Sequence, residues 1–90
     1  MNDRIGMIRA RLCEALAPER IEIEDDSARH AGHAGARSGG GHFNLLIVSQ
    51  RFAGLGLLAR HRLVYDALAD AMQRDIHALS IRAYAPGETP

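Results

Sequence analysis

The chain has 90 residues, of which 47% are hydrophobic and 24% are charged, and its 11 basic and 11 acidic residues cancel to a net charge of +0. A chain this short has room for one hydrophobic core and buries roughly 60–65% of its unfolded surface, so a deep closed catalytic pocket is not expected. The neutral charge argues against general binding to nucleic acids or membrane surfaces, which relies on excess cations. We therefore expect a single domain over residues 1–90 that acts as a binding or adaptor module and not as an enzyme.

The cysteine content and the apolar runs bear on where the protein works. The single cysteine, Cys13, excludes an intramolecular disulfide and fits a reducing compartment, and we interpret it as a small core residue. The longest apolar run, 45–48, is far below the roughly 20 residues that a membrane-spanning helix needs. The start of the chain carries no recognisable export signal. We expect a cytoplasmic protein that does not cross a membrane.

The first elements are one helix and one strand. Apolar residues recur at three- and four-residue steps between residues 3 and 17, which predicts an amphipathic helix that Asn2 or Asp3 caps and that Ala17-Pro18 ends. Residues 20–24 alternate charged and apolar side chains, which indicates a strand with one wet face. Residues 28–41 form a loop rich in Gly, Ala and His, long enough to suggest a functional role.

The rest of the chain predicts strand, helix and strand. Residues 42–49 form a strand that pairs antiparallel with the first, and after a turn at 50–54 a helix runs from residue 57 or 59 to 73. The last strand covers 76–84, and residues 1–2 and 85–90 are expected to fray. This order predicts an α+β fold, in which helices pack on one face of a small mixed three-stranded sheet and leave the other face exposed.

Histidine is the most informative residue type, because five of the 90 residues are histidines and three of them, His30, His33 and His42, lie in or beside the glycine-rich loop. Imidazole is a common ligand for borderline metals. Too few ligands converge for a self-contained zinc site, so a site completed by a partner is the remaining metal hypothesis. His77 lies two residues before Leu79, so strand alternation places it on the same apolar face. There its ring is costly to bury unless it is hydrogen-bonded or has a function.

Arg60-His61-Arg62 opens the main helix with positive charge. Cations near a helix N-terminus oppose the helix dipole, so these side chains need a partner such as Asp25 and Asp26, or they form a phosphate-contacting patch. Residues 32–35 match the GXXG of a KH nucleic-acid module but lie between two strands, so we treat the match as accidental. No nucleophile, P-loop or Rossmann pattern is present, which leaves catalysis without a candidate.

The order and spacing of several segments carry a family resemblance: along nearly its whole length the chain resembles the BolA family. These segments are Asp26 to Gly35, His42-Phe43 with Ile47-Val48-Ser49, Arg51-Phe52-Ala53-Gly54, Arg60 to Tyr65, Leu68-Ala69-Asp70 and Ile76 to Ile81. The resemblance implies a fold similar to class II KH domains, αββ(α)αβ, without the RNA-binding GXXG. It also implies a role in iron–sulfur cluster assembly, trafficking or iron sensing.

The partner and the ligands also follow from the resemblance. BolA-family proteins act with a monothiol glutaredoxin, sharing a bridging [2Fe–2S] cluster held by the glutaredoxin cysteine, a glutathione thiol and ligands of the BolA protein. The C-terminal histidine of the family falls on His77. The second ligand, a His or Cys in the first loop, falls on His30 when aligned from Ser27 and on His33 when counted back from His42. Alone, the protein is expected to hold no tightly bound cofactor and to be a monomer or weak homodimer.

A competing hypothesis comes from the same resemblance, since some BolA-like proteins are thought to be DNA-binding transcription regulators. In that case Arg60, His61 and Arg62 would contact phosphates. The net charge of +0 weakens this hypothesis, although a local basic face could still bind.

Overall fold

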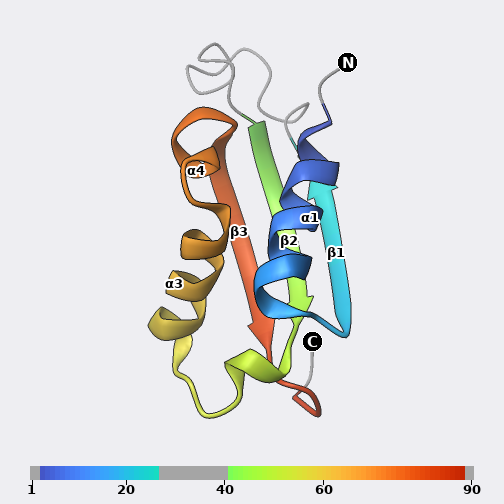
Figure 1. Ribbon diagram of the computed structural model, residues 1–90, viewed down its shortest axis with the longest axis vertical. Helices are drawn as coiled ribbons and strands as arrows, with labels where there is room; N and C mark the ends of the chain where they lie inside the picture. The colour runs from blue at the N-terminus through green and yellow to red at the C-terminus, as the bar shows by residue number, and fades with distance from the viewer. Residues whose placement is uncertain (1–2, 27–40, 89–90) are drawn as a thin grey trace.

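A computed structural model describes residues 3–26 and 41–88 and shows two layers, helices and a sheet (Figure 1). The order along the chain is α1 (Arg4–Leu16), β1 (Arg20–Asp25), β2 (Gly41–Val48), the short 3-10 helix η2 (Gln50–Phe52), α3 (Leu57–Leu68), α4 (Ala71–Arg74) and β3 (Ile76–Tyr84). The sheet has the order β1-β2-β3. β1 pairs antiparallel with β2, as predicted, and β3 pairs parallel with β2. The predicted mixed three-stranded sheet is therefore confirmed.

One face of the sheet carries the hydrophobic core. Alternate residues of the strands point to it and pack against buried side chains of α1 and α3, because side chains alternate across a strand and recur every three or four residues on a helix. The buried core members on these elements are Phe43, Leu45, Ile47, Ile76, Ala83, Ile8, Leu12, Leu16, Val64 and Leu68. The opposite face bears Glu22, Asn44 and Arg82 along an open hollow of about 410 Å³. The prediction that helices cover only one face is confirmed.

The first helix begins and ends close to its predicted limits. Its cap is Asp3, whose carboxylate accepts a hydrogen bond from the Gly6 backbone N–H at 2.9 Å. It ends where Ala17 turns to the left-handed region, with φ of 44°. Cys13 faces outward and is exposed, so the prediction that it is a core residue is wrong. The core positions of this helix are Ile8, Leu12 and Leu16, and Cys13 lies off that stripe.

The main helix is shorter than predicted, because it breaks at Ala69. This residue has φ of 50° and ψ of −128°, which ends α3 at Leu68 and separates it from the single turn of α4. Arg11 of α1 stabilises the break by donating from Nη1 to the Leu68 carbonyl at 2.6 Å and to the Asp70 carboxylate at 3.2 Å. The break lets Ala71 enter the core, with 1% of its surface exposed.

The chain after β3 is held in place, so the prediction that it frays from residue 85 is wrong for residues 85–88. Ala85 is buried, and the Glu88 backbone N–H donates to the Ala85 carbonyl at 3.0 Å. Most of the predicted loop at 28–41 lies outside the described residues, and Gly41 is already the buried first residue of β2. Within residues 3–26 and 41–88, no helix is long and apolar enough to cross a membrane.

Candidate metal-binding site

His77 lies at an irregularity near the start of β3. Gly41 pairs with Ile76 and His42 pairs with Ala78, so His77 is an extra residue without a partner position on β2. Such a bulge redirects the side chain that it contains. Ile76 enters the core, while His77 is exposed. The expectation that His77 lies on the apolar face is therefore wrong, since the strict alternation that supported it stops at the bulge.

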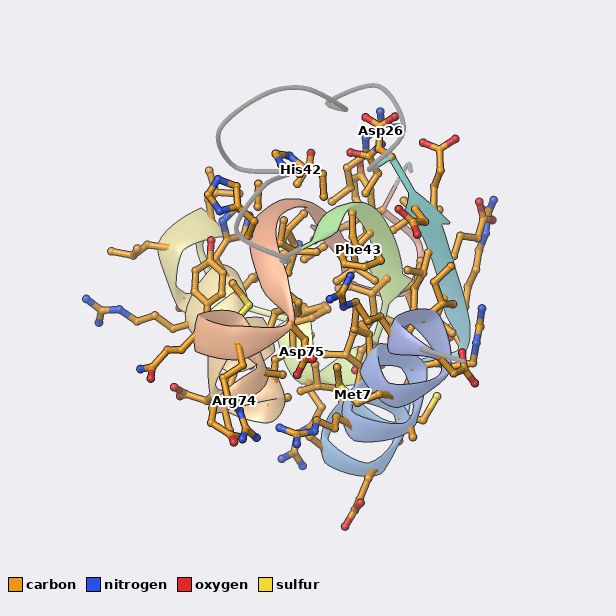
Figure 2. The ribbon with its side chains drawn as sticks, turned by 90° about the horizontal axis from the view of Figure 1, so that it is seen from above. Met7, Asp26, His42, Phe43, Arg74 and Asp75 are labelled. Carbon is orange, nitrogen blue, oxygen red and sulfur yellow. The ribbon has the colours of Figure 1, made fainter. Side chains whose placement is uncertain are left out.

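The bulge brings His77 against His42, the second residue of β2. The centroids of the two imidazole rings are 5.0 Å apart, and the ring planes are inclined by 46°. His42 is half-buried and lies on the open side of the sheet, away from α1, as Figure 2 shows from above. In the sequence His42 lies beside the loop and in one of the segments of the family resemblance, but it is not among the expected ligands. The register of a parallel pair would have revealed the contact, but register is not encoded within either strand.

A hollow of about 260 Å³ adjoins His42 at this end of the sheet. Its lining residues are Asp26, His42, Phe43, Asn44, Ala78, Leu79 and Ser80. The end of the strand pair is fixed by backbone hydrogen bonds, from the Asp26 N–H to the His42 carbonyl at 2.7 Å and from the Gly41 N–H to the Asp75 carbonyl at 3.1 Å. In Figure 2, Asp26 and His42 both lie on the outer side of the sheet. Asp26 and His42 therefore line the same open hollow.

The two loop histidines expected as ligands, His30 and His33, lie outside the described residues. Across residues 3–26 and 41–88 there is no group of three or more His, Cys, Asp or Glu side chains that could hold a metal ion. The imidazoles that the described part brings together are those of His42 and His77.

The basic start of α3 has a different partner from the one expected. Arg60 is held by Glu88 through contacts of 2.5 and 2.9 Å, and not by Asp25 or Asp26. Its guanidinium also donates to the carbonyls of Leu55 at 2.8 Å and Ala83 at 3.0 Å, and only 12% of its side chain is exposed. The hydrogen bond to Glu88 raises the pKa of Arg60. Arg60 is thus a structural link between α3 and the end of β3.

The other two residues of this segment lie differently. Arg62 is exposed on α3. His61 meets Tyr65 edge-on, with 6.4 Å between ring centroids, and its buried Nε2 has no hydrogen-bond partner among the described residues. The large apolar side chains that are exposed in the described part, Leu57, Leu58 and Tyr65, all belong to α3. The outer side of this helix is therefore less polar than a basic phosphate-binding face.

The element order, the mixed sheet and the spacing of the segments are those of a known family, and a family model described as BolA-like protein matches residues 12–88. The chain belongs to the BolA-like family. A solved structure of the BolA domain of SufE1 from Arabidopsis thaliana superposes on this BolA-like chain with a TM-score of 0.85 and 46% identity, covering 99% of each chain. The expected BolA-like fold is confirmed.

Two curated relatives of the BolA-like chain differ in the share of their own length that the chain matches. SufE-like protein 1 of Arabidopsis thaliana, described as chloroplastic and mitochondrial, is 49% identical over 86 residues, which cover 90% of this chain but only 23% of that protein. The DNA-binding transcriptional regulator BolA of Vibrio cholerae is 40% identical over 82 residues, covering 91% of this chain and 74% of the regulator. The relatives that carry the BolA name are called BolA-like proteins or a transcriptional regulator, and these names do not denote enzymes. SufE-like protein 1 is chloroplastic and mitochondrial, so a cytoplasmic location of this chain stays a prediction.

Proposed function

We propose that this BolA-like chain binds a monothiol glutaredoxin and supplies ligands to a [2Fe–2S] cluster that the two proteins share with glutathione. The observation that supports this proposal best is the position of His77. The bulge at the start of β3 turns this imidazole out of the core and leaves it exposed, where a partner protein can reach it.

The donor chemistry fits a cluster. Imidazole binds iron in clusters that mix nitrogen and sulfur ligands, and replacing thiolate by imidazole makes the cluster less negative and raises its reduction potential. In this proposal His77 is one ligand of the chain, and His30 or His33 in the first loop is the second. The cysteine of the glutaredoxin and the glutathione thiol complete the set. When bound, the cluster would serve assembly, trafficking or iron sensing.

The test is anaerobic copurification with a monothiol glutaredoxin and glutathione, followed by visible absorption and circular dichroism of the complex. We expect His77→Ala to remove or reshape the visible dichroism bands, and His61→Ala, which removes an imidazole elsewhere, to leave them in place. The His30→Ala and His33→Ala variants identify the loop ligand in the same experiment. An unchanged spectrum in His77→Ala, with the complex still formed, would falsify the proposal.

A second candidate function is transcription regulation by DNA binding, which the name of the Vibrio cholerae relative favours. Arg62 is exposed and available to a phosphate, whereas the guanidinium of Arg60 is already occupied by Glu88 and two carbonyls. DNA binding should therefore weaken in Arg62→Ala without loss of stability, and its affinity should fall with salt. A gel shift at two salt concentrations with wild type and Arg62→Ala decides this candidate.

A further inference from the structure

We propose that the open face of the sheet joins two copies of this chain into a symmetric homodimer, in which the two sheets pack face to face. The helices lie on the opposite face (Figure 1). The open face bears the hollow of about 410 Å³, which residues of all three strands line. This homodimer is independent of the cluster proposed above, because the residues that form its interface are not the proposed ligands.

The middle of the open face is a row of three side chains with opposite charges at its two ends. Glu22 of β1 pairs with Leu46 of β2, and Leu46 pairs with Arg82 of β3. Residues directly opposite each other on paired strands share a face, so the three side chains lie side by side. Glu22 and Arg82 are exposed, and Leu46 is half-buried between them. Within residues 3–26 and 41–88, Arg82 makes no ion pair.

A second copy matches this row when it is turned over about a two-fold axis that runs along β2. This rotation exchanges the two edges of the sheet, so β1 of each copy lies over β3 of the other. Glu22 of each copy then faces Arg82 of the other copy, this contact occurs twice, and Leu46 meets its own counterpart at the centre. An axis across the strands would instead place β1 over β1 and set acidic side chains against each other, which costs free energy. The charges therefore favour the axis along the strands.

The neighbouring rows of the face are compatible with the same axis. On one side, Glu24 pairs with Asn44 and Asn44 with Ser80, so the Glu24 carboxylate faces a hydroxyl of the other copy that can donate to it. On the other side, Arg20 and Tyr84 stand at the two ends of a row, so the guanidinium of Arg20 faces an aromatic ring. Neither row places like charges opposite each other, so the complementarity extends along the face.

The size of the face limits the strength of the dimer. The three strands have 6, 8 and 9 residues. With about 4.8 Å between strands and about 3.3 Å per residue, the face measures roughly 350 Å² on each copy. Two such faces together bury less than the roughly 1,200 Å² at which stable interfaces begin. We therefore expect a weak dimer whose population rises with protein concentration and falls with salt.

The test is sedimentation equilibrium of the full chain at concentrations of about 10 µM to 1 mM, the range in which small interfaces associate. A reducing agent keeps the exposed Cys13 from forming a disulfide between copies. Glu22→Arg and Arg82→Glu should each weaken dimerisation at least about tenfold, because a like-charge contact then occurs twice. Arg9→Glu, which reverses an exposed charge on α1, is the matched control and should dimerise like the wild type.

Restoring the opposite charges separates this interface from any other surface. An equimolar mixture of the Glu22→Arg and Arg82→Glu chains brings opposite charges together in both contacts, so it should form a heterodimer although neither variant dimerises alone. The double variant Glu22→Arg/Arg82→Glu should recover the homodimer for the same reason. Thermal melts check that each variant is folded. A wild type that stays monomeric over the whole range, a dimer that neither single reversal weakens, or a mixture of folded variants that stays monomeric would overturn the inference.

Discussion

Glu88 holds Arg60 through two contacts, at 2.5 and 2.9 Å, and thereby ties the residues beyond β3 to the start of α3. The same carboxylate accepts the Ala85 backbone N–H at 2.9 Å. Arg60 in turn donates to the Ala83 carbonyl, so the contacts close a small network around the end of β3. Charge-assisted, two-pronged pairs of this kind are stronger than single surface contacts because both side chains are fixed by more than one bond.

This network predicts an acid-sensitive stability. The hydrogen bonds from Arg60 and Ala85 lower the pKa of Glu88 from 4.5 to about 2. A carboxyl group whose pKa is lower in the folded chain stabilises the fold above its unfolded pKa, and this contribution is lost as pH falls from 4.5 through about 2. Urea unfolding midpoints should therefore decline over that window in the wild type.

The matching variant is Glu88→Gln, which removes the titrating group. Its midpoint should be lower than that of the wild type at pH 7, and the decline in acid should be shallower, with exposed Glu19→Gln as the control that behaves like wild type. Equal acid profiles for wild type and Glu88→Gln would show that the pair does not act on stability. Arg60→Ala and the double variant complete a cycle that measures the coupling between the two side chains.

A second prediction concerns Ser49, which is polar and fully buried. Its hydroxyl donates to the Leu16 carbonyl at 2.6 Å and accepts the Arg51 backbone N–H at 3.1 Å, which joins the end of α1 to the turn after β2. Ser49→Ala would leave two backbone groups without these bonds and should cost about 1–3 kcal/mol of unfolding free energy. Ser80→Ala, on the exposed sheet face, should stay close to wild type in the same urea titration.

A third prediction tests how α1 secures the end of α3. Arg11→Met keeps an apolar stem but removes the donor to the Leu68 carbonyl and to Asp70. Because the Arg11 side chain is 35% exposed, we expect a modest loss of about 0.5–1.5 kcal/mol. Arg9→Met on the same helix removes only an exposed contact of 3.5 Å and is the control. An equal effect of the two substitutions would argue against a specific role for Arg11.

The helices and strands could be predicted from short stretches of sequence, because the spacing of apolar residues that favours each element is contained in the element itself. The spacing of Ile8, Leu12 and Leu16 indicates a helix with one apolar face, and the alternation that includes Phe43 and Leu45 indicates a strand. The end of the main helix is bound instead by Arg11, which lies 57 positions before the Leu68 carbonyl to which it donates. No window of sequence around Ala69 contains that contact.

The candidate site likewise has features that the sequence predicts and features that depend on how the strands pair. His77 was singled out from its residue type and its place in the family resemblance, yet its side-chain direction could not be predicted, because a bulge is a property of two strands in register. The same register brings in His42, which lies far from His77 in sequence. The sequence shows the charge of Arg60 but not its partner, because Glu88 lies in a C-terminal segment for which no regular structure is predicted.

Replacing Ala69, where α3 ends, by glycine should change the free energy of unfolding in the opposite direction to an alanine-to-glycine substitution inside a helix. With φ of 50° and ψ of −128°, this alanine occupies a conformation that favours glycine, so Ala69→Gly should raise the unfolding free energy by about 1 kcal/mol. Ala10→Gly, also at an exposed position but inside α1, should lower it by about 0.5–1 kcal/mol, because there glycine only adds freedom to the unfolded chain. Urea titrations of the two variants compare the backbone conformations directly. Destabilisation of similar size in both would mean that residue 69 continues the helix, and the division into α3 and α4 would then be wrong.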